Sequence, residues 1–367
     1  MIYFDNASTT KMDPDVIEVM NKAMIDSFAN PSSLHSLGFD VEKKIRKARA
    51  SIAKELGVKG DNLFFIPSGT IGNNAVINSC HVKGCNIVIS NTEHSSIQEL
   101  VNNRKDIEFR LVKTNRYGFV NEEDLLDKVD ANTSLVSIIH VQNELGSIND
   151  INTLAKKVKE KNRKTLFHSD GVQGFKKIPV DLKDIDFYTI SSHKINGPKG
   201  VAALYIKDPR SFNPLYFGGG QESGLFSSTE NTYGILAFEK AASLCTNYDN
   251  VKKINEYLRS ELVKVGGVKI ISPEVNFSPY ILNVCIDGIG AEVLLHYLEM
   301  DDIYISTGSA CSRGKESKVL KAIGLNASDI KGCIRLSFDR NTSIEEAEEF
   351  VKKVENRIDL IRGMVKR

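Results

Sequence analysis

The sequence lacks any long hydrophobic run, because no apolar stretch approaches the roughly 20 residues that a membrane helix needs. Its N-terminus has no signal-peptide pattern, and no internal repeat or low-complexity segment stands out. It also lacks an excess of either charge, since 48 basic and 47 acidic residues leave a net charge of +1. Such a balance provides no basic field for nucleic acid or a membrane surface. We therefore expect a cytoplasmic protein that binds neither nucleic acid nor membranes directly.

The sequence has few cysteines, and they are scattered. There are six, with no C-x-x-C pair and no histidine at metal-ligand spacing, at positions 80, 85, 245, 285, 311 and 333. This pattern predicts no metal site. It also predicts that most of the cysteines are small buried hydrophobes in a reducing compartment.

What the sequence does have is an alternation of strand-like and helix-like segments. Its 367 residues, 41% of them hydrophobic, are enough for a large core and for two domains. Seven strand candidates, mostly separated by helical segments, lie at 63–66, 86–90, 107–112, 135–141, 165–169, 187–191 and 201–206. This alternation predicts an α/β fold with a largely parallel, helix-covered sheet.

The pattern changes after residue 250. Helices at 251–265 and 343–362 flank strands at 268–271, 280–286 and 333–338, which indicates a smaller α+β unit. We predict a large domain over residues 13–248. The small domain combines residues 1–12 with residues 249–367.

Lys194 is the first candidate for covalent chemistry. It follows a buried strand in the motif Ser191-Ser192-His193-Lys194, and Gly-Pro and Lys-Gly turn pairs come next. The scaffold therefore holds Lys194 at a strand end. A lysine amine can form a Schiff base, and burial lowers its pKa towards the range of a nucleophile and base. By itself the Ser-His-Lys triplet is more often part of a solvated loop.

Asp170 is the partner that strengthens this interpretation. It lies at the carboxyl end of the strand predicted at 165–169, where open α/β sheets bind ligands, and 24 residues before Lys194. Pyridoxal phosphate needs an acidic partner for its ring nitrogen and a lysine for its aldehyde. Asp170 and Lys194 supply that pair. On its own, Asp170 would also suit a helix N-cap before Gly171.

A candidate anion cradle follows the strand at 63–66. In Ser68-Gly69-Thr70-Ile71-Gly72-Asn73-Asn74, free N–H groups at a helix start lie beside hydroxyl groups, which suits one phosphate. Gly69 and Thr70 are the candidate residues. The motif lacks the lysine of a Walker sequence, and an ordinary capped turn is the alternative.

Two polar residues that follow strands complete the expected crevice. His94 could lie over a flat ring, or could simply be hydrogen-bonded. Asn143 could hydrogen-bond a phenolic oxygen, or could form an Asx-turn before Gly146.

The smaller unit contributes a cysteine and an arginine. Cys311 lies in a loop of small residues with Arg313 and Lys315 close behind, and cations lower a thiol pKa. Arg335, on the strand predicted at 333–338, could pair with a substrate carboxylate in a bidentate fork. A strand arginine can also be a surface ion pair.

Together these motifs resemble the cysteine desulfurases, which are pyridoxal-phosphate enzymes of the class V aminotransferase superfamily. Four stretches carry the resemblance in family order: residues 3–10 (YFDNASTT), 30–36 (NPSSLHS), 191–194 (SSHK) and 309–311 (SAC). The last resembles the group with an extended cysteine loop. The resemblance implies fold type I, with a seven-stranded, mostly parallel sheet.

The resemblance also implies roles around the cofactor. Lys194 would carry the internal aldimine, Asp170 would pair with the ring nitrogen, and Gln173 would contact the ring oxygen. His94 would stack on the ring and move protons. The phosphate would be held by Thr70, Ser191 and His193, with Thr229 reaching the phosphate of the neighbouring subunit in a homodimer.

The implied reaction converts L-cysteine to L-alanine. Arg335 and Asn143 would bind the substrate carboxylate, and the freed Lys194 would remove the α-proton. The Cys311 thiolate would then attack the substrate sulfur and become a persulfide. An acceptor protein would take that sulfur for iron–sulfur cluster assembly, tRNA thiolation or a related pathway.

The chain departs from the family pattern at two places. Ile71 stands where the family usually has glutamate, and the loop at 221–228 (QESGLFSS) is not arginine-rich. Two alternatives therefore remain. One is a selenocysteine lyase or another class V aminotransferase-type enzyme that does not use Cys311, and the other is a non-catalytic paralogue that acts as a binding subunit.

Overall fold

A seven-stranded sheet dominates the computed structural model, which describes residues 1–307 and 316–365. Its seven strands run in the order β2-β8-β7-β6-β5-β3-β4. In this sheet β8 runs opposite to the other six strands. The strands are β2 (Leu63–Ile66), β3 (Asn86–Ser90), β4 (Glu108–Val112), β5 (Thr133–Ser137), β6 (Leu166–Asp170), β7 (Phe187–Ser191) and β8 (Ala202–Ile206). The predicted α/β fold with a mostly parallel seven-stranded sheet is confirmed.

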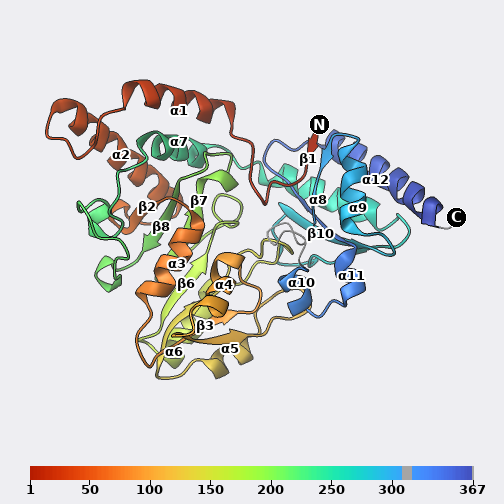
Figure 1. The fold of residues 1–367 in the computed structure, drawn as a ribbon, viewed down its shortest axis with the longest axis horizontal. Helices are drawn as coiled ribbons and strands as arrows, with labels where there is room; N and C mark the ends of the chain where they lie inside the picture. Colours follow the sequence, from red (N-terminus) through yellow and green to blue (C-terminus); the bar gives the residue numbers. More distant parts are fainter. Residues whose placement is uncertain (308–315, 366–367) are drawn as a thin grey trace.

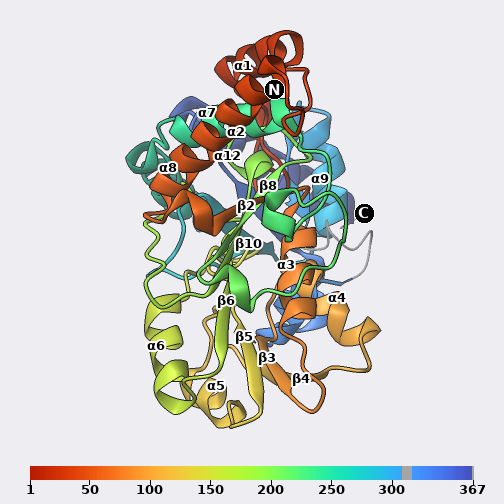
Figure 2. The ribbon, with the colours of Figure 1, turned by 90° about the vertical axis from the view of Figure 1, so that its left-hand side faces the viewer.

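Helices cover both faces of this sheet. In Figure 2, α5 and α6 lie on one side of the strands, and α3 and α4 lie on the other. Val88 and Val136 pack into one apolar cluster, whereas Ile87 and Ile89 pack into the cluster on the opposite face. Burial on both faces explains why these strands are continuous apolar runs. The helices are α1 (Pro14–Asp26), α2 (Ser36–Glu55), α3 (Gly69–Ser79), α4 (Ser95–Asn103), α5 (Glu122–Lys128), α6 (Ile151–Lys161) and α7 (Thr232–Ser243).

A second, antiparallel sheet lies beside the first (Figure 1). Its order is β12-β13-β10-β9, formed by β9 (Val268–Ile270), β10 (Ile281–Ile286), β12 (Ser306–Thr307) and β13 (Cys333–Ser337). Around it lie α8 (Tyr248–Leu262), α9 (Ala291–Glu299), α10 (Lys318–Ala322), α11 (Ala327–Lys331) and α12 (Ile344–Val365).

The N-terminus joins this second unit. β1 (Ile2–Tyr3) pairs in parallel with β11 (Ile303–Tyr304), and Phe4 is fully buried in the apolar cluster formed by α8, α9 and α12. The division into residues 13–248 and residues 1–12 with 249–367 remains a proposal, and these separate cores support it. Within the described residues, no helix is long and apolar enough to cross a membrane.

Some predictions about elements and cysteines were wrong. The short helices α10 and α11, five residues each, and the helix α9 were not predicted. Cys80, Cys285 and Cys333 are buried as predicted, but Cys245 is exposed, and Cys285 and Cys333 form a disulfide across β10 and β13 that was not predicted. The cross-strand pairing of the two strands brings these cysteines face to face, which spacing in the sequence does not reveal.

Candidate active site

A cavity of about 360 Å³ lies at the carboxyl ends of β6 and β7. It receives side chains from the large sheet, from the N-terminal segment and from β13. It brings together ten of the residues predicted from the sequence: Gly69, Thr70, His94, Asn143, Asp170, Gln173, Ser191, His193, Lys194 and Arg335. Of these ten residues, the two farthest apart in the sequence, Gly69 and Arg335, are separated by 266 positions.

Asp170 is the last residue of β6, and it is buried. Its Oδ2 accepts a hydrogen bond from Asn73 Nδ2 at 2.7 Å, and its Oδ1 accepts one from Val172 N at 3.0 Å. No helix begins at Gly171, so Asp170 is not a helix N-cap; its bond to Val172 N closes a local turn, and its carboxylate lines the cavity. Only glycine fits at 171, because a Cβ there would lie 2.0 Å from the Tyr188 ring.

Lys194 ends a short 3₁₀ turn, Ser192–Lys194, directly after β7. Its Nζ donates to Ala7 O at 2.5 Å and to Ser8 O at 2.7 Å. The lysine is therefore held against the N-terminal segment, and it is not part of a solvated loop. Its amine lies in the same cavity as the Asp170 carboxylate.

Gln173 lies one turn beyond Asp170, and its amide is held at both ends. Its Nε2 donates to Ala7 O at 2.8 Å, and its Oε1 accepts from Lys177 Nζ at 3.0 Å. Ala7 O therefore accepts hydrogen bonds from both Gln173 and Lys194.

The predicted anion cradle lies at the start of α3. Ser68 is its N-cap and accepts from Ile71 N at 3.3 Å, while Thr70 lies exposed in the first turn. Ser191 Oγ is buried and finds no hydrogen-bond partner among residues 1–307 and 316–365. A buried hydroxyl that faces a cavity without a partner suits a ligand oxygen.

His193 completes this cradle. Its Nδ1 lies 3.1 Å from Thr9 Oγ1. Burial, assisted by the charge of Lys194, lowers the pKa of His193 to about 4. The ring is therefore neutral at pH 7 and can donate through only one of its nitrogens.

His94 occupies the N-cap of α4. Its Nδ1 accepts from Ser96 N at 3.1 Å and lies 2.9 Å from Ser96 Oγ. Burial is the main cause that lowers the pKa of His94, and the charges of Lys194 and Arg335 act in the same direction. The hydrogen-bonded alternative is thus correct for Nδ1, while the ring still lines the cavity.

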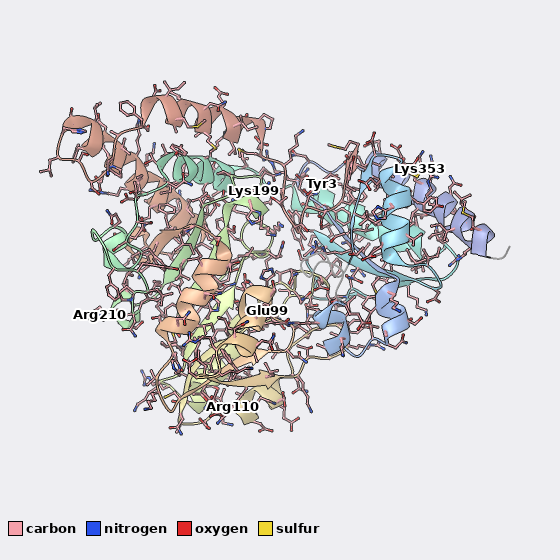
Figure 3. The ribbon with its side chains drawn as sticks, in the orientation of Figure 1. Tyr3, Glu99, Arg110, Lys199, Arg210 and Lys353 are labelled. Carbon is pink, nitrogen blue, oxygen red and sulfur yellow. A yellow bond between two sulfur atoms is a disulfide. The ribbon has the colours of Figure 1, made fainter. Side chains whose placement is uncertain are left out.

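Arg335 is buried, and it is not a surface ion pair. Its Nη2 donates to Asp5 Oδ1 at 2.9 Å and to Ser8 Oγ at 2.7 Å, and its Nη1 donates to Asn143 O at 3.1 Å. Figure 3 shows Tyr3, two residues before Asp5, at the junction between the two units. The N-terminal segment therefore holds this guanidinium at the edge of the cavity.

A larger cavity of about 830 Å³ adjoins the first and shares Thr70, His94, Ser96 and Asn143 with it. Two bonds span it: Ser317 Oγ donates to Glu144 Oε2 at 2.6 Å, and Lys318 Nζ lies 2.5 Å from Glu99 Oε1. Figure 3 shows Glu99 on α4, on the side of the second unit. The larger cavity therefore lies between the two units. It is continuous with the smaller cavity through the four residues that both share.

Two predicted site residues are not among those that line the smaller cavity. Thr229 is exposed, and its contact with a neighbouring subunit stays a prediction. Cys311 belongs to residues 308–315, which lie outside the described residues.

The altered loop at 221–228 has a physical explanation. Leu225 and Phe226 are buried in the apolar cluster beside α3, and the Phe226 ring centroid lies 5.5 Å from that of Phe212. Glu222 forms a two-bond ion pair with Arg49. Apolar packing and this ion pair thus fix the loop. None of the loop's residues lines the smaller cavity.

The sequence analysis missed several residues of the site: Asp5, Ala7, Ser8, Asn73, Ser96 and Lys177. Asn73 had a usable signal, because it lies one helical turn after Gly69 and so points to the same side of α3. Ala7 had none, since it contributes a backbone carbonyl that any residue could supply.

Comparison with known proteins agrees with this arrangement. The pattern of the aminotransferase class-V family matches residues 2–350. A NifS/IcsS protein homolog of Lactobacillus delbrueckii subsp. bulgaricus is 37% identical over 96% of this chain and 95% of its own length. The cysteine desulfurase IscS of Dictyoglomus turgidum is 33% identical over 98% of this chain and 95% of its own.

Solved structures lead to the same group. A NifS-like protein superimposes with a TM-score of 0.92 at 33% identity, covering 98% of this chain and 99% of its own. Both the sequence match and the structural match extend over nearly the full length. The chain therefore belongs to the class-V aminotransferase family and, within it, to the cysteine desulfurases.

Proposed function

We propose that this enzyme binds pyridoxal 5'-phosphate in the smaller cavity, converts L-cysteine to L-alanine, and receives the sulfur on Cys311 as a persulfide. The observation that carries the proposal is the gathering of Asp170, Gln173, Lys194 and Arg335 around one cavity at the strand ends. The bound cofactor would supply an electron sink for the carbanion formed at the substrate α-carbon.

The residues present fit that cofactor. Asp170 can pair with a protonated ring nitrogen, Lys194 can hold the aldehyde, and Gln173 can contact the ring oxygen. The unpartnered Ser191 hydroxyl supports a phosphate site beside the N-terminus of α3. Gly69, Thr70 and His193 would complete that site, and His94 would lie over the ring.

The chain's own groups then divide the chemistry among them. Arg335 and Asn143 would bind the substrate carboxylate, and Arg335 needs no large movement because Asp5 and Ser8 already hold its guanidinium. The Lys194 amine would accept the α-proton and return a proton to the product. The sulfur–sulfur bond forms at Cys311 as the substrate carbon–sulfur bond breaks.

A homodimer is part of the proposal. In the segment between α1 and α2 and at the start of α2, the residues Phe28, Leu34 and Leu37 are exposed at 73%, 104% and 54%. Exposed apolar side chains gathered in this way are typical of a protein–protein interface. In the dimer, Thr229 would reach the neighbouring subunit's cofactor phosphate. A sulfur-acceptor protein and a cytoplasmic location remain predictions.

The test is the release of alanine and sulfide from L-cysteine, with a reducing thiol, after reconstitution with pyridoxal phosphate. We expect equal amounts of the two products from the wild type and a loss of at least about 100-fold for Lys194→Ala and for Cys311→Ala. Cys245→Ala, which removes an exposed cysteine, is the matched control and should retain activity.

Each alternative has its own outcome. Wild-type cysteine turnover by Cys311→Ala would contradict the persulfide step. A cofactor absorbance band with turnover of selenocysteine but not cysteine would indicate a selenocysteine lyase. If no cofactor band appears on reconstitution, a non-catalytic binding subunit is the better description.

A further inference from the structure

Lys177 is a buried lysine that the proposed reaction does not use. Only 6% of its surface is exposed, and it forms no ion pair with a carboxylate in the part of the chain that the structure describes. Its Nζ donates to Gln173 Oε1 at 3.0 Å and lies 5.6 Å from the centre of the Tyr280 ring.

Burial of this amine is unfavourable. Desolvation, assisted by the nearby charge of Lys194, lowers the pKa of Lys177 to about 7. A methionine of similar length would avoid this penalty, because it buries no polar group. Packing alone therefore does not account for a lysine at this position, which leaves its one hydrogen bond to be explained.

That bond determines which way the Gln173 amide faces. The two ends of a glutamine amide have nearly the same shape, so their orientation is set by their partners. In the charged form that predominates below pH 7, the Lys177 ammonium group only donates, so it requires Oε1 on its side. Ala7 O only accepts, so it requires Nε2 on the other side. Both contacts select one orientation, and the flipped amide would lose both.

The selected orientation of the Gln173 amide matters because Gln173 lines the smaller cavity, the proposed cofactor site. Nε2 carries two hydrogens, and Ala7 O takes one of them. We propose that Lys177 is a positioning residue, which fixes the Gln173 amide so that the second Nε2 hydrogen is available to the ring oxygen of the cofactor. The inference rests on the proposed use of pyridoxal phosphate, and it adds the residue that controls this contact.

The experiment uses the reconstituted protein and compares Lys177→Met with Lys176→Met. Lys176 is the adjacent lysine, but its Nζ pairs with Glu55 at 2.5 Å, so its replacement removes the same charge without touching Gln173. We measure the Kd for pyridoxal phosphate, the absorbance maximum of the bound cofactor and the melting temperature. We expect Lys177→Met to weaken binding by about 3- to 10-fold, the value of one hydrogen bond, and to shift the absorbance band.

A purely structural role for Lys177 predicts a different pattern. It would lower the melting temperature and leave the absorbance band unchanged, whereas we expect the band to shift without a lower melting temperature. Lys176→Met should match the wild type in Kd and absorbance. Lys177→Gln keeps an N–H donor, so we expect it to remain within about twofold of the wild-type Kd.

A double-mutant cycle identifies the route of the effect. If Lys177 acts through Gln173, Lys177→Met should add nothing to the loss caused by Gln173→Ala. Additive losses would overturn the inference, as would a Lys177→Met protein with wild-type Kd and absorbance. Should Lys177→Met not fold, a loss in Lys177→Gln as large as that in Gln173→Ala overturns it. Failure of the wild type to bind the cofactor would instead sink the proposed function, and this inference with it.

Discussion

Glu93 gives a sharp test of how this site is built. Its carboxyl group is fully buried beside His94, and its Oε1 accepts from Ser90 Oγ at 2.6 Å and from Ile139 N at 2.8 Å. These bonds link the end of β3 to the segment that follows β5. Its Oε2 has no hydrogen-bond partner within the described structure. Desolvation raises the pKa of Glu93 from 4.5 to about 8.

The raised pKa fixes the sign of the effect on stability. Between pH 4.5 and pH 8 the unfolded chain has released this proton and the folded chain still holds it. The folded state therefore loses stability as the pH rises through that window, by about 1.4 kcal/mol per pH unit. Over the whole window the loss is about 4–5 kcal/mol. Above pH 8 both states are ionised, and the loss levels off.

Glu93→Gln removes this titration and keeps an oxygen for both hydrogen bonds. The buried amide N–H groups add a cost of about 1–3 kcal/mol that does not depend on pH. We therefore expect the difference in unfolding free energy between variant and wild type to rise steadily in favour of the variant from pH 5 to pH 8.

Urea denaturation of both proteins at several pH values measures this difference. The neutral histidines His140 and His168 also titrate on unfolding, but they do so in both proteins and cancel. Glu292→Gln, at an exposed position in the first turn of α9, controls for the loss of one negative charge. A difference that stays constant from pH 5 to pH 8 would refute the reasoning.

Two further predictions concern packing around the site, in addition to the activity and positioning experiments above. Gly171→Ala should destabilise the protein by at least about 3 kcal/mol and abolish detectable cofactor binding, because its Cβ would lie 2.0 Å from the Tyr188 ring and the strain would move Asp170. Urea titration measures the stability, and cofactor absorbance measures the binding. A wild-type Kd for the cofactor would contradict this prediction. Phe226→Ala should cost about 3–5 kcal/mol in the same unfolding assay, because it empties a buried site against Phe212, whereas a loss below 1 kcal/mol would mean that the loop is not fixed by this contact.

The large sheet could be predicted from the sequence because its strands are buried on both faces. Such strands are short apolar runs between turn residues, and the predicted limits of β2, β3 and β7 match the structure. β5 was predicted to extend to Val141, but its regular pairing ends at Ser137. The chain does continue beside β6, since His140 N donates to Asp170 O.

The site residues that could be predicted share one property. Asp170, His94 and Lys194 each carry a reactive polar side chain at or shortly after the end of an apolar strand, and parallel strands end at the same edge of a sheet. Local sequence was therefore sufficient to place them together. Arg335 comes from another unit of the chain, and only the resemblance to the cysteine desulfurases predicted that it shares a site with the others.

The residues that were missed depend on long-range packing and on backbone atoms. The bond between Arg335 and Asp5 joins residues 330 positions apart, and no local pattern marks either as the partner of the other. Nothing in the local sequence distinguishes Lys177 from an exposed lysine. Its burial depends on packing against residues far along the chain, such as Tyr280. Asp5 and Lys177 are ionisable side chains, and their surroundings are formed where the two units pack together.

The N-terminal segment shows the limit of sequence reasoning most clearly. Ala7 and Ser8 contribute carbonyl oxygens that accept from Lys194 Nζ, and Ala7 O also accepts from Gln173 Nε2. Because every residue carries a carbonyl group, a change of side chain at position 7 leaves these acceptors in place, provided the new side chain fits the buried space. The position of the backbone is what matters. That position is secured from both sides, since Ala7 N donates to Ser337 Oγ at 2.8 Å and Thr10 N donates to His193 O at 2.9 Å. The segment thus links the strand that carries Arg335 to the turn that carries Lys194. The substrate-binding guanidinium and the reactive amine of the proposed site therefore keep a fixed position relative to each other, although they come from different units of the chain.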